Sequence, residues 1–324
     1  MDQEEELRIR TAEYTDRDKE IRAYGTSLRR WGLWGPDDEK GALNFITSAH
    51  RIRAAGLVRT GKTFHLGLPL KSGVGPQVGN VGRFNPMHLM THTGDTHGPV
   101  DLGTAVDFTD DMLVMPVQCS TQWDALCHLY YDDTLYNGFP SSSVTAYGAG
   151  RDGIDKVSAD FVGRGVLLDV AAHMQVDVLD PAYLITSQDL EATAAECGVE
   201  VGEGDILLVR TGAMTVVNGD DWSRFNACTA GLHYRTAEWL GDRRVAAVAT
   251  DTNAVEGLSP LSGIQNPLHM VALRDMGIHL GELWDLEDLA ADCREDSVWE
   301  FLLVAQALMI VGGTGSPINP IAMK

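Results

Sequence analysis

The chain has 324 residues and a formal net charge of −21, from 25 lysines and arginines against 46 aspartates and glutamates. Because phosphate binding depends on cationic side chains, this balance argues against nucleic acid or an anionic membrane as a partner. Hydrophobic residues make up 44% of the chain, which is typical of a soluble globular protein with a substantial core.

The cysteines and the N-terminal segment indicate where the protein resides. Five cysteines are scattered without metal-finger spacing, which favours reduced thiols in the cytoplasm. Residues 1–20 are charged and lack the apolar stretch of a signal peptide, and no apolar run reaches about 18 residues. The sequence therefore predicts a cytoplasmic protein without a membrane span.

The first half of the chain predicts strands separated by long loops. Residues 1–30 alternate charges at helical spacing and are expected to form an N-terminal arm. An alternating stretch at 62–70 predicts a strand, and the glycine-rich stretch 71–100 predicts a long loop that serves as a lid or site wall. The apolar stretch 111–117 then predicts a strand that leads into "VQCSTQWDALCH".

The second half alternates buried strands with helices. Apolar strands are expected at 163–169, 205–210, 245–250 and 299–310, and another at 278–282. A helix is expected from 187, capped by Thr186 or Ser187 and ended by Gly198, and another over 266–276, ended by Gly277. This alternation predicts an α/β fold, and the absence of a linker or repeat predicts a single domain over 1–324.

Four polar residues gather in "VQCSTQWDALCH". In an extended segment Gln118, Gln122 and Asp124 fall on one face, and His128 lies near Asp124 if the chain turns helical there. Polar groups that converge among apolar neighbours are costly unless they bond one another or are used in chemistry. Both readings, a catalytic set and a hydrogen-bonded network that fixes the loop, stay open at this point.

A second pair of residues lies later in the chain. His269 begins the helix expected over 266–276, and the strand that follows can run back and bring Glu282 beside it. Apolar neighbours around Glu282 favour a buried and therefore paired carboxylate. The alternative interpretation is that His269 only caps the helix and that Glu282 is a surface acid. His92, in "MHLMTHTGD", is a further candidate for lining a site.

These residues carry a resemblance to a known family. The chain resembles the cyclase-type metal-dependent hydrolases, which include bacterial kynurenine formamidase and isatin hydrolase. The family motif HxGTHxDxPxH falls on residues 118–128, with Thr121, Asp124 and His128 retained, and the run "TQWDAL" resembles its cyclase branch. The resemblance implies a swivelling β/β/α domain with a mixed sheet and flanking helices, assembled as a homodimer or homotetramer.

The chain departs from the family at two motif histidines, which are Gln118 and Gln122 here. In the family those histidines hold zinc or manganese, and an imidazole nitrogen is a better ligand for such ions than an amide oxygen. The resemblance therefore implies one divalent metal, Zn²⁺ or Mn²⁺, held by Asp124, His269 and Glu282, with Gln122 as a weak fourth ligand.

The leading expectation is a hydrolase that cleaves an amide, lactam or lactone in a small cyclic or aromatic substrate with a metal-activated water. His128 and Asp124 are its expected catalytic residues, with His128 moving the proton. Gln118, Gln122, Trp123 and His92 are expected to bind the substrate. Two alternatives remain: a metal-free lyase or cyclase of a natural-product pathway, and a family member that only binds a ligand.

Overall fold

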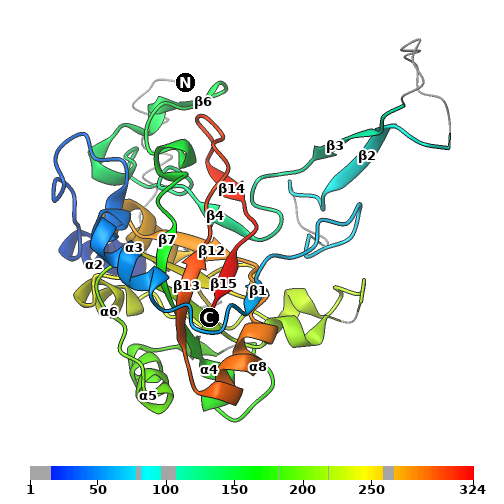
Figure 1. The fold of residues 1–324 in the computed structure, drawn as a ribbon. Helices are drawn as coiled ribbons and strands as arrows, with labels where there is room; N and C mark the ends of the chain where they lie inside the picture. The colour runs from blue at the N-terminus through cyan, green and yellow to red at the C-terminus, as the bar shows by residue number, and fades with distance from the viewer. Residues whose placement is uncertain (1–15, 78–81, 96–106, 182, 218, 258–265) are drawn as a thin grey trace.

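The computed structural model describes residues 16–77, 82–95, 107–181, 183–217, 219–257 and 266–324. A nine-stranded mixed sheet organises them, in the order β1-β15-β13-β7-β9-β11-β12-β4-β14 (Figure 1). Four central strands are parallel, and antiparallel strands flank them on both sides. The α/β fold with a mixed sheet and flanking helices is confirmed.

The elements have the following bounds. The strands of the large sheet are β1 (Thr63–His65), β4 (Gln122–Asp124), β7 (Val162–Asp169), β9 (Ile206–Arg210), β11 (Ala247–Thr250), β12 (His279–Glu282), β13 (Glu300–Val304), β14 (Gly315–Pro317) and β15 (Ile321–Met323). Three small sheets pair β2 (Met87–His92) with β3 (Asp110–Val114), β5 (Val144–Thr145) with β6 (Gly148–Ala149), and β8 (Leu184–Ile185) with β10 (Gly231–Leu232). The helices are α2 (Asp16–Ser27), α3 (Ser48–Ala55), α4 (Val170–His173), α5 (Ser187–Cys197), α6 (Thr236–Asp242), α7 (Pro267–His269), the π-helix η7 (Met270–Met276) and α8 (Glu287–Asp296).

Two apolar cores cover the two faces of the large sheet. The central strands are buried along nearly their whole length, as expected of parallel strands enclosed on both faces. One core packs β7, β9 and β11 against α5, α6 and η7, and the other contains Trp123, Phe161 and Trp284 with residues of α8. None of the helices in the described residues is long and apolar enough to cross a membrane.

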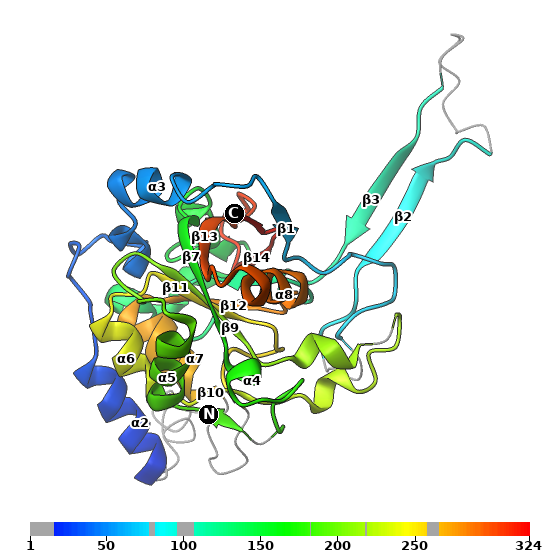
Figure 2. The same cartoon turned by 60° about the horizontal axis from the view of Figure 1, so that its bottom comes forward.

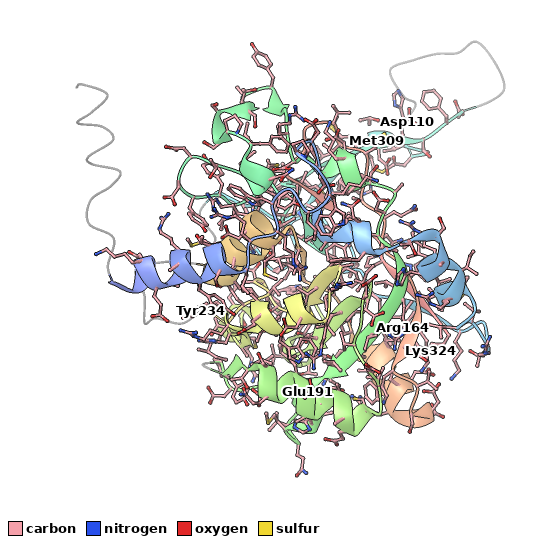
Figure 3. The ribbon with its side chains drawn as sticks, turned by 90° about the vertical axis from the view of Figure 1, so that its left-hand side faces the viewer. Asp110, Arg164, Glu191, Tyr234, Met309 and Lys324 are labelled. Carbon is pink, nitrogen blue, oxygen red and sulfur yellow. The ribbon has the colours of Figure 1, made fainter. Side chains whose placement is uncertain are left out.

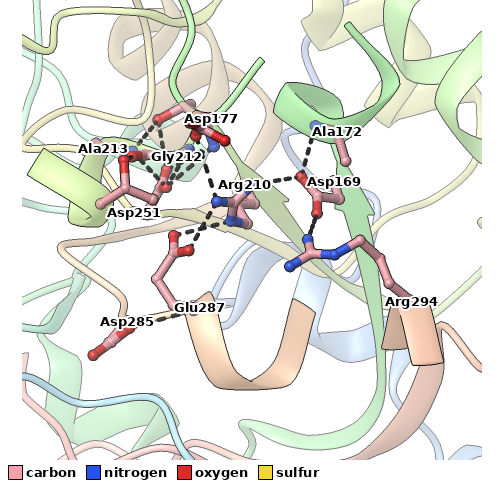
Figure 4. A network of polar contacts seen from close by, with 12 residues as sticks. Asp169, Ala172, Asp177, Arg210, Gly212, Ala213, Asp251, Asp285, Glu287 and Arg294 are labelled. Carbon is pink, nitrogen blue, oxygen red and sulfur yellow. Dashed lines mark hydrogen bonds and ion pairs between the residues drawn. The ribbon is translucent and has the colours of Figure 1, made fainter. Parts of the chain in front are cut away.

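A buried ionic network ties the carboxyl ends of the central strands together (Figure 4). The guanidinium of Arg210, at the end of β9, donates to Asp169 at the end of β7 and to Glu287 at the start of α8. Asp251, just after β11, accepts backbone N–H bonds from residues 211–213, and burial raises its pKa to about 6. This edge of the sheet, from which Glu282 also emerges, is therefore held rigidly.

Several expected elements are confirmed and others differ. Helix α5 begins after Thr186, whose side chain accepts from the Asp189 N–H, and ends at Gly198 with φ +64. The segment expected to be a loop over 71–100 contains strand β2, which pairs with β3. Strand β3 itself is exposed along its length. An apolar run gives no sign of whether the strand it forms lies in the core or outside it.

The N-terminal segment begins, in the described residues, with helix α2, which lies against η7. Arg29, just beyond α2, donates to Asp275 at 2.9 Å, and Trp31 donates its indole N–H to the Arg274 carbonyl at 2.7 Å. Residues 1–15 of the expected arm fall outside the described residues. The remainder of that segment is attached to the body by these polar contacts.

Candidate metal centre

Three residues from distant parts of the chain meet beside strands β4 and β12. Glu282 ends β12, and its register partner on the antiparallel strand β4 is Gln122, two residues before Asp124. His269 ends the short helix α7, which leads into η7 and then back into β12. The carboxyl ends of parallel strands are where α/β folds commonly place ligands, and Glu282 lies at such an end.

The three side chains converge in a buried cluster. His269 Nε2 lies 3.3 Å from Glu282 Oε1 and 3.5 Å from Asp124 Oδ2. One ligand atom from each residue lies within 4.8 Å of the others, and all three residues are buried. Among the described residues, this is the group of acids and imidazoles spaced to hold a metal ion. The structure thus brings together the three residues expected as metal ligands.

Glu256 orients His269, a relationship that the sequence did not reveal. Its Oε1 accepts a hydrogen bond from His269 Nδ1 at 2.5 Å, and its carboxylate also accepts the backbone N–H groups of Leu268 and His269. Because Nδ1 is engaged as the donor, Nε2 faces Asp124 and Glu282. Only a weak sign of this role is visible in the sequence, an acid directly after the apolar pair Ala254 and Val255.

The two glutamines occupy different places. Gln122 donates from its single amide nitrogen to Asp124 Oδ1 at 3.2 Å and to Glu282 Oε2 at 3.0 Å. Gln118 lies farther out, with its amide nitrogen 3.3 Å from His128 Nδ1 and 3.1 Å from Thr314 Oγ1. Only Gln122 therefore touches the carboxylates of the cluster.

Burial and mutual charge shift the pKa values of the cluster. Burial, together with the neighbouring charge of Asp124, raises the pKa of Glu282 to about 7. Burial also raises the pKa of Asp124, but the charges of His128 and His269 outweigh it, and the net pKa lies below the usual value. Burial lowers the pKa of His269, while the neighbouring carboxylates of Asp124, Glu256 and Glu282 raise it well above its ordinary value. The cluster thus concentrates negative charge around one imidazole.

The cluster has the donors that a divalent cation requires. Asp124, His269 and Glu282 provide an oxygen, nitrogen and oxygen set of the kind that binds Zn²⁺ or Mn²⁺. Two buried oxygens of the same cluster, Gln122 Oε1 and Asp124 Oδ2, have no hydrogen-bond partner among the described residues. Buried polar atoms without partners are costly, and a cation between the carboxylates would satisfy Asp124 Oδ2 directly and Gln122 Oε1 after a half-turn of its amide group. The residues present therefore fit a single divalent ion.

His128 lies at the outer side of the cluster, on a turn rather than a helix. Its backbone N–H donates to Ala125 O at 2.9 Å, and its Nε2 lies 3.8 Å from Asp124 Oδ1. Its side chain is 23% exposed, whereas that of Asp124 is 1% exposed. Burial lowers the pKa of His128, despite the opposing charge of Asp124. The imidazole of His128 therefore lies between the buried acids and the outside.

Two expected substrate-binding residues lie elsewhere. Trp123 points to the other face of β4, where it stacks on Phe161 at 4.7 Å and donates to Ala305 O at 2.8 Å. It is 0% exposed, so it has no surface to offer a substrate. His92 lies on β2 at the far end of the β2–β3 hairpin, against Phe108 with ring centroids 4.5 Å apart. The structure does not bring either residue together with the cluster.

Arg83 is a second residue that the sequence did not single out. Its Nη1 donates to the backbone oxygen of Gln118 at 3.3 Å. Its positive charge also interacts with Asp124 and Glu282. It therefore places a cation near the acidic cluster of a strongly acidic chain.

Comparisons with known proteins agree with this architecture. A family model described as "Putative cyclase" matches residues 63–257. An isatin hydrolase of Roseibium aggregatum is 30% identical over 154 residues, which are 44% of this chain and 54% of that protein. The alignment thus spans about half the length of that curated relative.

Solved structures extend the likeness over most of the chain. The crystal structure of a novel cyclase is 38% identical, with a TM-score of 0.83, and the match covers 92% of this chain and 100% of that one. Isatin hydrolase A from Ralstonia solanacearum is 17% identical with a TM-score of 0.59, covering 86% of this chain and 98% of that one. At 17% identity, the similarity to isatin hydrolase A shows a shared fold and no more.

Proposed function

This chain belongs to the cyclase family, and on that premise we propose that it is a metal-dependent hydrolase. The observation that carries the proposal is the convergence of Asp124, His269 and Glu282 in a buried cluster that includes two oxygens without hydrogen-bond partners among the described residues. The bond proposed for cleavage is the amide, lactam or lactone of a small cyclic or aromatic compound. The partial similarity to an isatin hydrolase makes a ring-fused cyclic amide the first substrate class to test.

The metal would be held by Asp124, His269 and Glu282. When bound, a divalent cation lowers the pKa of a water molecule and polarises a carbonyl group. Glu256 supports this arrangement because it holds the proton of His269 on Nδ1 and leaves Nε2 free to act as a ligand. Gln122 would add its amide oxygen after a half-turn of the amide group, since its nitrogen now faces both carboxylates.

His128 is the proposed proton carrier. Its Nε2 faces the cluster, 3.8 Å from Asp124 Oδ1, so Nε2 would carry a proton from the attacking water to the leaving nitrogen or oxygen. For Nε2 to accept that proton, the ring hydrogen has to lie on Nδ1, and the Gln118 amide, whose nitrogen now lies 3.3 Å from Nδ1, would turn to accept it through its oxygen. The lowered pKa of His128, caused first by burial, means that the protonated ring then passes the proton readily to the leaving group.

Arg83 is proposed to bind the acidic product. Hydrolysis of an amide or lactone produces a carboxylate, and two buried carboxylates in the site would repel it. The guanidinium near Gln118 supplies a compensating charge on the side where His128 is exposed. The affinity of the site for the carboxylate product would then depend on Arg83.

The proposal is tested by metal dependence of hydrolysis. The protein is stripped with a chelator, reloaded with Mn²⁺ or Zn²⁺, and assayed on isatin, a formylated aromatic amine and an aromatic lactone. We expect ring opening or deformylation of at least one compound, lost on stripping and restored by metal. Hydrolysis that persists at full rate after complete metal removal would contradict the proposal.

One observation favours a second candidate, a metal-free lyase or cyclase. The amide nitrogen of Gln122 donates to both carboxylates and so holds the cluster together through hydrogen bonds alone. In that case Asp124 and His128 would act as an acid–base pair. Elimination or ring closure that is indifferent to chelator would support this candidate.

A further inference from the structure

The backbone turns sharply directly after Glu282. Leu283 has φ +63, in the left-handed region, and it is 0% exposed. In the part of the chain that the structure describes, the other non-glycine residues with positive φ all carry polar side chains. This conformation is costly for a bulky aliphatic residue, and backbone strain of this kind gathers at functional sites. The strained residue follows one of the three proposed metal ligands.

The turn is a bulge at the end of β12, which runs beside β11 in the large sheet (Figure 2). The Leu283 N–H donates to Thr252 O at 2.9 Å, and the Trp284 N–H donates to Thr250 O at 3.1 Å. Successive N–H groups of a regular strand point to opposite sides, so two that bond the same neighbouring segment indicate a bulge. Bulges beside active sites re-aim a side chain or end the pairing. Here the bulge ends the strand at Glu282, whose carboxylate enters the cluster.

The Thr121 hydroxyl holds this bulge from the other side. The register of β12 with β4 pairs Glu282 with Gln122, so the next position along both chains brings Leu283 toward Thr121. Thr121 Oγ1 donates to Leu283 O at 2.5 Å and accepts the Leu68 N–H at 2.8 Å. Thr121 is 1% exposed, so loss of its hydroxyl would leave two buried backbone groups without these bonds.

The same hydroxyl bond connects the segments of two proposed metal ligands. Thr121 lies three residues before Asp124, and Leu283 directly follows Glu282. The Thr121 backbone is fixed as well, because its carbonyl accepts the Ile318 N–H at 3.0 Å. The distance between the two carboxylates therefore depends on how Thr121 and Leu283 meet. Contacts behind metal ligands orient those ligands and tune the affinity for the metal.

We propose that Thr121 is a positioning residue for the metal site. Its hydroxyl holds Leu283 in the strained conformation, and the resulting bulge keeps the Glu282 carboxylate at the distance from Asp124 that one divalent ion requires. Thr121 acts through the backbone of Leu283 rather than as a ligand. This inference rests on the proposed metal site and assigns a residue outside the ligand set to it.

The metal affinity of Thr121 variants tests the proposal without reference to activity. Thr121→Val removes the hydroxyl and keeps the shape, whereas Thr121→Ser keeps the hydroxyl. The matched control is Thr193→Val, because Thr193 is also 1% exposed and its hydroxyl also donates to a backbone carbonyl, that of Asp189, at 2.7 Å. Thr193 lies on α5, the helix that carries Glu191, at the lower edge of the molecule in Figure 3.

Affinity for Mn²⁺ and Zn²⁺ is measured by competition with a coloured chelator, well below the melting temperature of each variant. We expect Thr121→Val to weaken binding about 10- to 100-fold, and Thr121→Ser to stay within about threefold of the wild type. Thr193→Val should lower the melting temperature, as Thr121→Val does, but keep the wild-type affinity. Should Thr121→Val not fold, Thr121→Ala takes its place with the same expected loss.

The outcomes separate this role from the proposed function. Wild-type affinity in the variant without the hydroxyl would overturn the positioning role and leave the metal site intact. An equal loss in Thr121→Ser or in Thr193→Val would also overturn it, because the loss would then not follow the hydroxyl or its place. A wild type that binds neither ion would overturn the proposed function together with this role.

A second pair of variants tests the strain at Leu283. Leu283→Gly and Leu283→Ala both remove the apolar side chain, but glycine adopts φ +63 freely and alanine does not. We expect the glycine variant to melt at the higher temperature, the reverse of the order at a regular strand position. A higher melting temperature for the alanine variant would overturn the strained turn on which the proposal stands.

Discussion

Glu256 Oε1 accepts a hydrogen bond from His269 Nδ1 at 2.5 Å, and this contact decides which nitrogen of the imidazole faces the two acids. Both residues are almost completely buried, at 2% and 1% exposed. The pair resembles the carboxylate–histidine arrangement that orients metal ligands in general. His269 can therefore act as a ligand only because a residue 13 positions earlier holds it in place.

Glu256→Gln is expected to weaken metal binding about 10- to 100-fold, because the neutral amide holds the Nδ1 proton less firmly. Metal affinity is measured by competition with a coloured chelator. Glu203→Gln, which removes a surface partner of Arg244, serves as the control and should leave affinity unchanged. Equal affinities for Glu256→Gln and wild type would show that Glu256 does not orient a ligand.

Gln122→His should tighten metal binding at least about 10-fold, because imidazole replaces an amide that now donates to both carboxylates. Hydrolysis should be altered or reduced, since the new ligand changes the coordination. Gln118→His is the matched control, because the ring of His128 lies between Gln118 and Asp124. A gain in affinity from Gln118→His, with none from Gln122→His, would reverse the assignment of the two glutamines.

His128→Asn is expected to reduce turnover about 10²- to 10⁴-fold, because the proton carrier is removed. Metal content and melting temperature should stay at wild-type values, since His128 is not among the three metal ligands. His173→Asn is a matched control, because His173 is also 23% exposed and also lies beside an acid, Glu196. Full activity in the His128 variant would remove it from the mechanism.

Asp152 is expected to make stability depend on pH. Its two carboxylate oxygens are buried without hydrogen-bond partners in the part of the chain that the structure describes, and burial, with the charges of Glu39 and Asp38, raises its pKa to about 8. The folded state therefore holds a proton that the unfolded state releases near pH 4. The contribution of Asp152 to the free energy of unfolding is therefore fully present below about pH 4 and is lost as the pH rises toward 8.

Asp152→Asn removes this titration and keeps the shape of the side chain. Asn also tolerates the left-handed backbone of this position, where φ is +57. We expect the variant to gain about 1–3 kcal/mol in unfolding free energy at pH 9 and much less at pH 5, measured by urea denaturation. Asp220→Asn, at an exposed pair with Lys71, is the control. An equal gain at both pH values would contradict the assigned pKa.

The sequence predicted the central strands of the large sheet well because they are apolar along their length, as in β9 and β11. Two strands that lie beyond residue 312, β14 and β15, are short and were not predicted. The resemblance to the family placed Asp124, His269 and Glu282 as one group, whereas the residues alone indicated two separate sets. The sequence could not show that Gln118 and Gln122 lie in different places relative to the metal ligands. Residues 117–121 turn instead of extending, and even spacing implies a common face only in a strand.

The sequence could not predict the roles of residues that act through contacts with distant parts of the chain. Glu256 and Arg83 have no motif, and only the fold brings them to His269 and Gln118. Trp123 was expected to face a substrate because it lies inside the motif, but the alternation of β4 turns it into the core. The alternation that puts Gln122 and Asp124 on one face of a strand puts Trp123 on the other, so the role expected for Trp123 disagreed with the expected strand.

Asp124, His269 and Glu282 are proposed to hold one divalent ion, and elemental analysis of the freshly purified protein tests this assignment. We expect about one Zn²⁺ or Mn²⁺ per chain in the wild type, and a large loss in an Asp124→Asn/Glu282→Gln variant that still folds. A wild type that holds no metal, even after incubation with either ion, would rule out this metal site, and two ions per chain would rule out the role given to the glutamines.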